Sequence, residues 1–434
     1  MRRVLIVSPH FPPANGADVH RVRAVVPFLK QFGWEPYVLA VDPRMLAVPE
    51  DAWLAEGVPV DLPVVRVRAL GLRWSAIPGL GSLDFRALRA MKLAGLKLLQ
   101  SQKFDLVYFS TTVFSLNVLG PHWKRNTGVP FLIDYQDPWV SDYYRENPGV
   151  APPGGRIKNA IMSRIHAYNE SRVISCCSGI TSVSPTYPEQ LRRRYSHLQS
   201  LPFRVLQFPV ALRDLLRMRE SSVSQCVFPV NDGLRHWVYV GRGGPDMAKS
   251  LKAIFTALRQ WQGDCPELYR STRLHFIGTS YAPAGKGEPT VLPLAAECGV
   301  ADIVTESTDR IAFSSMLKCL LDADALIIPG SDDAAYTASK LLPYLVVGKP
   351  VLTVFHERSP ACQLLRQLGG AVSVTFRNDD RVDRIADRVT EQWLLQNRFK
   401  DSVALDLDKL RPYTDQGQAE ILCDFFSAVV NGAE

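Results

Sequence analysis

The sequence lacks the features by which several classes of protein are recognised. Its eight cysteines include no C-x-x-C pair, and Cys176 and Cys177 stand side by side, so neither a metal motif nor a disulfide framework is indicated. No apolar run reaches the ~18 residues that a membrane-spanning helix needs. The apolar stretch after Arg2 and Arg3 covers only Val4–Val7, which is too short for a signal peptide and predicts a cytoplasmic protein.

Charge of neither sign dominates, because 50 basic and 43 acidic residues leave a net charge of +7. The segment 66–103 departs from this balance, with eight basic residues and one acidic residue, Asp84. It suits either an anionic membrane surface or a solvated helix face with snorkelling side chains. On the first interpretation, charge reversal at Arg86, Arg89 and Lys92 weakens binding to membranes. No recognition motif for nucleic acid accompanies the charge, so no nucleic-acid partner is expected.

The sequence does contain a regular alternation of short apolar runs with helical stretches. A chain of 434 residues is too long for one ordinary core, which predicts two domains. The alternation indicates doubly wound α/β domains, and it is interrupted between residues 210 and 234. We expect one domain over 1–209, a second over 210–400, and a closing segment 401–434 that returns to the first. The runs expected to form strands are Val4–Val7, Tyr37–Val41, Val64–Val67, Leu106–Ser110, Phe131–Asp134, Phe203–Gln207, Trp237–Val240, Arg273–Gly278, Ala325–Ile328 and Val351–Phe355. The helical stretches are Val19–Phe32, Leu83–Leu99, Asp246–Trp261, Asp309–Leu321, Ser339–Val347 and Asp415–Val430.

A β–loop–α–β unit near the C-terminal third carries the first candidate ligand site. Ser339 and Lys340 begin its helix, which Gly348 ends as a C-cap. The loop and the helix start lie at the carboxyl end of a strand, where open α/β sheets bind ligands. A hydroxyl, a cation and free backbone N–H groups suit a phosphate. The alternative is an ordinary N-cap beside a solvated lysine.

A second candidate site follows the strand that opens the C-terminal α/β series, where the chain reads GRGGPDMAKS. Gly241, Gly243 and Gly244 allow a tight turn with close backbone approach. Arg242 and Lys249 supply positive charge around the start of the next helix. A diphosphate is the natural ligand of such a loop. For Lys249 the alternative is a solvated helix residue.

The first βα turn of the chain, SPHFPPANG, lacks the G-x-G-x-x-G pattern and does not predict a dinucleotide site. Gly16 lets a backbone approach a ligand, and Asp18 is placed to cap the following helix. Together with His20, they are candidates for an acceptor or phosphate loop.

Three segments, considered together, resemble the retaining glycosyltransferases of family 4, which have the GT-B fold. These are SPHFPP…G…R…L…GW, YVGRGG…K and ASKLLPYLVVGKPVL, and the resemblance covers nearly the whole chain. It implies two doubly wound, Rossmann-like domains that face a cleft. The N-terminal domain would hold a saccharide or lipid-linked acceptor and the C-terminal domain a nucleotide-sugar donor. The implied reaction belongs to bacterial surface polysaccharide or glycoconjugate synthesis, at the inner membrane face, and needs neither metal nor cofactor.

The resemblance also implies roles for particular residues. Arg242 and Lys249 would contact the donor diphosphate, and Ser339 and Lys340 would lie beside the same phosphates. Asp137 would lie near the transferred sugar, where it could orient a hydroxyl or take the acceptor proton.

Asp137 belongs to the sequence DYQDPW, in which Asp134, Gln136 and Trp139 also cluster at a strand end. Trp139 is expected to offer a flat apolar surface to a sugar ring. The alternative for Asp137 is a turn aspartate that bonds to its own backbone before a proline.

One departure from the family pattern bears on activity. The family usually carries two glutamates around the last of these helices, and their places are taken here by Ala335 and Pro343. The second glutamate commonly holds the nucleotide ribose. Two other functions remain open, and the missing glutamates favour the second of them. One is a nucleotide-sugar epimerase of the same fold, which needs a donor but no separate acceptor, and the other is a non-catalytic nucleotide-binding protein.

Overall fold

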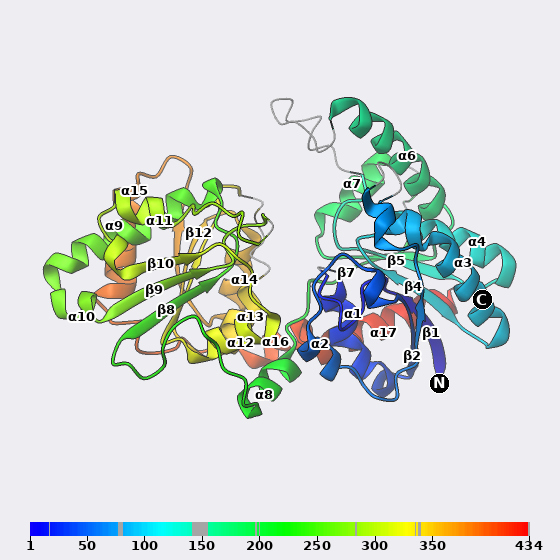
Figure 1. Ribbon diagram of the computed structural model, residues 1–434, viewed down its shortest axis with the longest axis horizontal. Helices are drawn as coiled ribbons and strands as arrows, with labels where there is room; N and C mark the ends of the chain where they lie inside the picture. Colours follow the sequence, from blue (N-terminus) through cyan, green and yellow to red (C-terminus); the bar gives the residue numbers. More distant parts are fainter. Residues whose placement is uncertain are drawn as a thin grey trace. The chain divides into compact units, whose positions relative to one another are not determined.

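The computed structural model divides the chain into two compact α/β units. In Figure 1 the colours follow the sequence, so unit 1 contains both the blue N-terminal part and the red C-terminal helix. Unit 1 comprises Met1–Pro209 and Pro412–Glu434, and unit 2 comprises Val210–Arg411. The structure describes residues 1–16, 18–76, 81–140, 155–195, 198, 200–282, 284–334, 336 and 340–432. Two predicted positions, Ser339 and Ala335, lie outside these residues.

Unit 1 is built on a parallel sheet with the order β3-β2-β1-β4-β5-β6-β7. In β1 to β3 the chain moves toward one edge, and in β4 to β7 it moves toward the other, so the order reverses between β1 and β4. The register places Val4 of β1 opposite both Pro36 of β2 and Leu106 of β4. The strands are β1 (Arg2–Val7), β2 (Trp34–Val41), β3 (Val64–Val67), β4 (Leu106–Ser110), β5 (Phe131–Tyr135), β6 (Gly179–Ser182) and β7 (Phe203–Val205).

Helices cover both faces of this sheet. One apolar cluster joins the sheet to α3 and α4, and the other joins it to α1 and α17. In the second cluster Phe426 packs edge-on against Trp34 and Tyr108, so the C-terminal helix belongs to the core of unit 1. The helices are α1 (Val19–Val25), α2 (Ala52–Glu56), α3 (Leu83–Ser101), α4 (Leu119–Thr127), α6 (Arg156–Ile174), α7 (Thr186–Arg194) and α17 (Asp415–Asn431).

Unit 2 is built on a second parallel sheet with the order β10-β9-β8-β11-β12-β13. Its order reverses between β8 and β11, which are paired in parallel. The strands are β8 (Arg235–Val240), β9 (Thr272–Ile277), β10 (Val304–Ser307), β11 (Ala325–Pro329), β12 (Val351–His356) and β13 (Val372–Phe376).

The helices of unit 2 enclose an aromatic core in which Trp237 packs against Trp261, Trp393 and Phe399. These helices are α8 (Leu212–Glu220), α9 (Ala248–Asp264), α10 (Pro266–Arg270), α11 (Leu292–Glu297), α12 (Phe313–Asp322), α13 (Leu341–Val346), α14 (Pro360–Leu368), α15 (Val382–Val389) and α16 (Leu407–Leu410). Short helical turns occur within the chain as well, namely η1 (Val26–Phe32), η2 (Pro43–Met45), η3 (Leu72–Ala76), η4 (Phe114–Val118), η6 (Pro245–Met247), η7 (Ala301–Ile303), η8 (Thr390–Leu394) and η9 (Arg411–Tyr413).

Several predicted elements differ from the observed ones for local reasons. The single helix expected over Val19–Phe32 changes from α1 to the 3-10 helix η1 at Val26, next to Pro27, which cannot donate a backbone hydrogen bond. Gly33 ends it with a φ of +83°, a conformation that glycine adopts without strain. The interrupted region 210–234 contains the helix α8, which the sequence pattern did not indicate.

Candidate functional site

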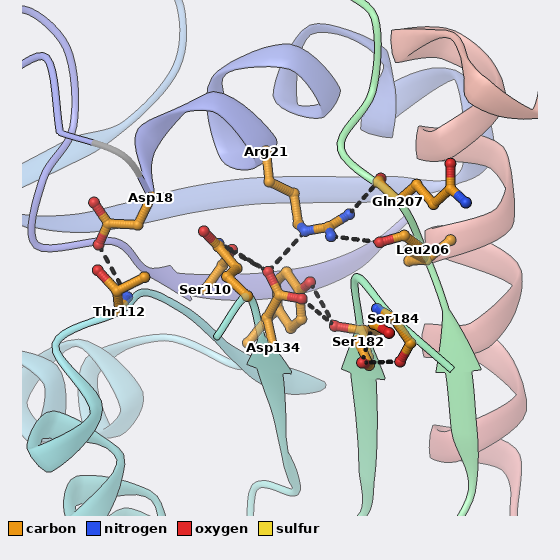
Figure 2. A network of polar contacts seen from close by, with 12 residues as sticks. Asp18, Arg21, Ser110, Thr112, Asp134, Ser182, Ser184, Leu206 and Gln207 are labelled. Carbon is orange, nitrogen blue, oxygen red and sulfur yellow. Dashed lines mark hydrogen bonds and ion pairs between the residues drawn. The ribbon is translucent and has the colours of Figure 1, made fainter. Parts of the chain in front are cut away.

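The carboxyl edge of the sheet in unit 1 carries a closely connected polar group at the reversal point between β1 and β4. The Asp18 carboxylate accepts hydrogen bonds from Thr111 Oγ1 at 2.8 Å and from the backbone N–H of Thr112 at 3.2 Å, the latter drawn in Figure 2. His10 Nδ1 lies 2.8 Å from the other oxygen of Asp18. The prediction that Asp18 caps α1 is wrong, because its side chain makes no cap hydrogen bond. It connects the loop after β1 with the end of β4 instead.

Electrostatics keep Asp18 ionised although it is fully buried. Burial alone would raise its pKa, but the hydrogen bonds from His10 and Thr111 and the nearby imidazole outweigh burial and lower it. Gly16 packs against Asp18 and His10, since a Cβ at this position would lie 3.0 Å from both Asp18 Oδ1 and His10 Cγ. His20, predicted for the same loop, is half-buried on α1.

A second buried group in unit 1 is an ion pair between Arg21 of α1 and Asp134 of β5. Arg21 Nε lies 2.7 Å from Asp134 Oδ2, and both side chains are almost completely buried. The Arg21 guanidinium also donates to the carbonyls of Leu206 and Gln207, as Figure 2 shows. Asp134 accepts further hydrogen bonds from Ser110, Gln136 and Thr181. With its oxygens taken up in this way, Asp134 is a structural anchor of the strand ends.

Asp137 lies two residues beyond the end of β5 and is exposed, so it is free of this buried network. Desolvation by its surroundings raises its pKa. Trp139 is 6% exposed, stacks on Phe114 with ring centroids 6.0 Å apart, and donates its indole N–H to His166. The expectation that Trp139 offers an open surface to a sugar ring is therefore wrong.

In unit 2, the loop after β8 is fixed by its own contacts. The N–H groups of Gly241 and Gly243 donate to the carbonyls of Ile277 and Thr279, so these two N–H groups are already used. Gly241, Gly243 and Gly244 do not have a positive φ. Glycine is needed at these positions because a Cβ would come too close to neighbouring atoms. A Cβ at Gly244 would lie 2.1 Å from Arg242 Nη1.

Arg242 forms a two-pronged ion pair with Asp246 inside the same loop. Its Nη1 and Nη2 lie 2.7 and 2.8 Å from the two carboxylate oxygens. The hydrogen bonds and charge of Asp246 raise the pKa of Arg242, and Arg242 in turn lowers that of Asp246. Both side chains are 31% exposed, so the pair is open to solvent. Any phosphate that binds Arg242 shares this cation with Asp246.

Lys340 directly precedes α13, and its side chain reaches the end of β8 at the reversal point of unit 2. Its Nζ donates to the Val240 carbonyl at 2.8 Å and lies beside Gly241, where a Cβ would be only 2.9 Å away. Lys340 as a whole residue is exposed, but its ammonium group points toward the end of β8. Desolvation of that group, followed by repulsion from Arg310 and Arg242, lowers its pKa to about 8.

Arg310 is a third cation of this edge, and sequence reasoning missed it. It follows β10, is exposed, and lies over the Tyr281 ring with the guanidinium carbon 5.7 Å from the centroid. Its positive charge contributes to the lowered pKa of Lys340. Within the described part of the chain no carboxylate pairs with Arg310 or Lys340. The positive charge at this edge is therefore only partly neutralised.

The remaining predictions for unit 2 have different outcomes. Lys249 lies on α9, and its Nζ donates to the carbonyls of Arg377 and Asn378 at 3.1 and 2.6 Å. The predicted helix Ser339–Val347 is shorter and begins at Leu341, and Gly348 follows it with a φ of +78°. Pro343 lies in the first turn of α13, where its missing N–H costs no helical hydrogen bond.

One part of the membrane prediction is wrong. Arg86 is 4% exposed and donates hydrogen bonds to the carbonyls of Gly81, Met45 and Leu70, so its charge holds the start of α3. The exposed basic residues of α3 are Arg89, Lys92 and Lys97. No helix among the described residues is long and apolar enough to span a membrane. Nor does any group of His, Cys, Asp and Glu in the described ranges have the geometry of a metal site.

Comparisons with known proteins bear on the fold. No family model matches the chain, and no curated protein sequence matches it. Among solved structures, the lipopolysaccharide outer core galactosyltransferase WaaB is similar over 98% of this chain and 100% of its own, with a TM-score of 0.53 and 13% identity. An α,α-trehalose 6-phosphate synthase from Burkholderia multivorans covers 100% of both chains, with a TM-score of 0.56 and 14% identity.

A candidate UDP-N-acetylglucosamine 2-epimerase from Listeria monocytogenes is also similar, with a TM-score of 0.53 and 10% identity over 98% of this chain and 96% of that one. These likenesses, together with the two parallel sheets, confirm the predicted GT-B fold. At such low identity they show the fold and leave the activity open.

Proposed function

We propose that this protein is a glycosyltransferase that moves a sugar from a nucleotide-diphosphate sugar to a saccharide or lipid-linked acceptor. The observation that supports it best is the gathering of Arg242, Arg310 and Lys340 around the glycine-rich loop after β8. This edge is the place where doubly wound sheets bind ligands. An excess of positive charge there suits the two phosphates of a nucleotide donor better than it suits a neutral ligand.

The same cations also suit the chemistry of sugar transfer. When the bond between the sugar and the diphosphate breaks, negative charge grows on the departing phosphate oxygen. Fixed positive groups directed at that oxygen stabilise the transition state more than the ground state. Lys340 and Arg310 have no carboxylate partner among the described residues and can serve this role directly. Arg242 contributes while held in place by Asp246. We further propose that the reaction proceeds without a metal ion.

For unit 1 we propose acceptor binding at the carboxyl edge of the sheet. Asp137 is exposed there, and its carboxylate can accept hydrogen bonds from acceptor hydroxyls. Changing Asp137 to Asn keeps the shape of the side chain and removes its charge. We expect nucleotide binding to be unchanged and turnover to fall by ~10²-fold. Normal turnover in a stable variant would leave Asp137 as a turn residue.

A peripheral position on an anionic membrane surface fits a lipid-linked acceptor. On α3 the basic residues Arg89, Lys92 and Lys97 share the exposed side of the helix with Phe85 and Leu93, which are 47% and 59% exposed. Basic and apolar side chains on one exposed helix face are typical of helices that lie on anionic bilayers.

A nucleotide-sugar epimerase is the second candidate function. It is favoured by the structural similarity to the Listeria monocytogenes protein. The experiment that separates the two supplies a panel of UDP-, GDP- and ADP-sugars, with and without lipid-linked saccharide acceptors. A transferase releases nucleotide faster when an acceptor is present. Conversion of a sugar nucleotide into its epimer without an acceptor would identify an epimerase, and no turnover in either arm would contradict both functions.

A further inference from the structure

A pair of buried histidines in unit 2 takes no part in the site described above. His236 of β8 and His275 of β9 are 4% and 6% exposed, and they lie on the face of the sheet opposite Trp237. His236 Nδ1 lies 2.9 Å from His275 Nε2. On one side of the pair, His236 Nε2 lies 3.1 Å from Asp232 Oδ1. On the other side, His275 Nδ1 lies 2.8 Å from Thr305 Oγ1, which completes a continuous chain of hydrogen bonds.

Residues 221–234, the covering segment, close over this pair. Phe228 stacks on both imidazoles, with its ring centroid 4.8 Å from that of His236 and 4.9 Å from that of His275. The same segment supplies Asp232, which accepts the hydrogen bond from His236. The two histidines therefore hold the covering segment both by stacking and by a hydrogen bond.

The chain of hydrogen bonds is complete when both imidazoles are neutral. The hydrogen bonds from the Leu234 N–H and from His236 lower the pKa of Asp232, so its ionised carboxylate accepts from His236 Nε2. His236 Nδ1 then accepts from His275 Nε2. His275 Nδ1 accepts from the Thr305 hydroxyl, so each ring nitrogen has a partner.

One added proton fits the same heavy-atom positions, and a second does not. With one proton, His236 is an imidazolium beside Asp232 and donates to His275 Nε2. His275 then donates from Nδ1 to Thr305, whose hydroxyl has the Leu274 carbonyl as acceptor at 3.3 Å. With two protons, His236 and His275 would direct N–H groups at each other and place two positive charges in a buried site.

The surroundings of the pair also oppose the second proton. Burial, followed by repulsion from His236 and Arg273, lowers the pKa of His275 to about 4. The other charged and titratable groups on this side of the sheet are Cys226 and Asp232 of the covering segment, Asp324 before β11, which accepts the His236 backbone N–H, and Cys319 with the ion pair Lys318–Asp322 on α12.

We propose that His236 and His275 form a pH-sensitive latch that holds the covering segment on the sheet of unit 2 and releases it in mild acid. With the segment open, both imidazoles reach water and take up protons near the ordinary histidine value of about 6.5. The closed pair accepts one proton and resists the second down to about pH 4. Between these values the open form binds more protons, so opening becomes about tenfold more favourable for each pH unit of acidification.

Strand β9 connects this latch with the glycine-rich loop. Just beyond His275, the carbonyl of Ile277 accepts the N–H of Gly241 at 2.8 Å, and that of Thr279 accepts the N–H of Gly243 at 2.9 Å. Opening of the latch loosens β9 and the loop together, so a bound diphosphate should keep the covering segment closed. This consequence rests on the proposed function, whereas the pH dependence does not.

Hydrogen exchange of the full-length protein, followed by mass spectrometry between about pH 5 and pH 7.5, tests the latch. After correction for the intrinsic exchange rates, peptides from 221–234 should open about tenfold more often for each pH unit below 6.5. Peptides from β4 of unit 1 are the internal control. Constant protection of 221–234 over this range would overturn the latch.

Two variants should change this pH dependence in opposite directions. H275Q should flatten it, because the remaining His236 takes up its proton beside Asp232 in the closed form. D232N should steepen it, since the first proton then lacks its counter-charge. H122Q, which changes a histidine of unit 1, is the matched control and should behave as wild type. A wild-type dependence in both H275Q and D232N would overturn the latch.

The wild-type protein provides a further test that needs no folded variant. In ¹⁵N spectra of histidine-labelled protein at about pH 5, His236 and His275 of the folded state should hold one added proton between them. Two fully protonated rings in the folded state would overturn the latch.

A saturating nucleoside diphosphate, the one of UDP, GDP and ADP that binds best, tests the link to the donor loop. At about pH 5.5 it should lower the opening of 221–234 by the factor 1 + [L]/Kd. Unchanged opening with bound diphosphate would overturn the link. Failure of all three to bind would contradict the proposed function and leave the pH dependence as the test of the latch.

Discussion

The two reversal points of the protein are built alike but carry opposite charge. In unit 1 a carboxylate, Asp18, links the loop after β1 with the end of β4. In unit 2 a cation, Lys340, links the segment before α13 with the end of β8. The same fold position thus offers an oriented imidazole in one unit and a set of cations in the other. The difference indicates that ligand chemistry is decided by a few loop side chains and not by the sheet that carries them.

The two units also differ in how their ion pairs are buried. Arg21 and Asp134 of unit 1 have almost no exposure, whereas Arg242 and Asp246 of unit 2 each keep 31%. The first pair belongs to the scaffold, since its partners leave no room for a ligand. The second is open to solvent and can share its cation with an incoming anion.

The largest expected effect is a loss of stability when the carboxylate of the buried pair loses its charge. D134N leaves the Arg21 guanidinium buried without its counter-charge, which should lower the free energy of unfolding by about 3–5 kcal/mol. D246N, the matched change at the open pair, should cost at most about 1 kcal/mol. Urea unfolding of both variants measures the difference. Equal losses would show that burial does not separate the two pairs.

The next effect concerns the cations of unit 2. K340A and R310A each remove a cation that has no carboxylate partner among the residues the structure describes, and each should weaken binding of the best nucleoside diphosphate by ~10–100-fold. R242A should cost less, because Asp246 already neutralises part of its charge, and K249A less again, since its ammonium has two carbonyl partners. Calorimetric titration gives the order. An R242A loss larger than that of K340A would contradict it.

The pKa of Lys340 predicts how diphosphate binding depends on pH. Its pKa of about 8 lies below the ordinary value of 10.5, so the free protein loses this charge as the pH rises through 8. A bound diphosphate favours the charged form, and binding between about pH 8 and pH 10 should therefore take up a proton. Affinity should fall across that range in the wild type and stay flatter in K340A. Titrations in buffers of different ionisation enthalpy measure the proton uptake directly, and no uptake at pH 9 would argue against Lys340 as a phosphate ligand.

The smallest expected effect is on membrane binding. Reversing Arg89, Lys92 and Lys97 to glutamate should reduce sedimentation with anionic vesicles at low salt, since each basic residue near such a surface contributes ~1 kcal/mol. Reversal of three exposed basic residues of unit 2, Arg398, Lys400 and Lys409, changes the net charge equally and is the control. Equal losses in both variants would indicate a general charge effect, not a surface on α3.

The sequence predicted the fold well because buried parallel strands are continuous apolar runs. Val64–Val67 and Leu106–Ser110 were predicted with the observed bounds. The strand β10, with the mostly polar sequence VTES, gave no such signal.

The candidate site was harder to predict, because its contacts join residues that are far apart in the chain. Lys340 meets Val240 across 100 residues, and Asp18 meets Thr111 across 93. A motif places a loop at a strand end, but it does not show whether a nearby carboxylate already occupies the cation. Arg310 was missed because it belongs to no recognised motif.

The central claim is that the carboxyl edge of unit 2 holds the diphosphate of a nucleotide donor. Calorimetric titration of the wild-type protein with UDP, GDP and ADP, each compared with the corresponding nucleoside, tests it most directly. We expect one diphosphate to bind at least ~10-fold more tightly than its nucleoside, because the phosphates meet Lys340 and Arg310. Equal affinity for diphosphate and nucleoside, or no binding of any of the three, would contradict the claim.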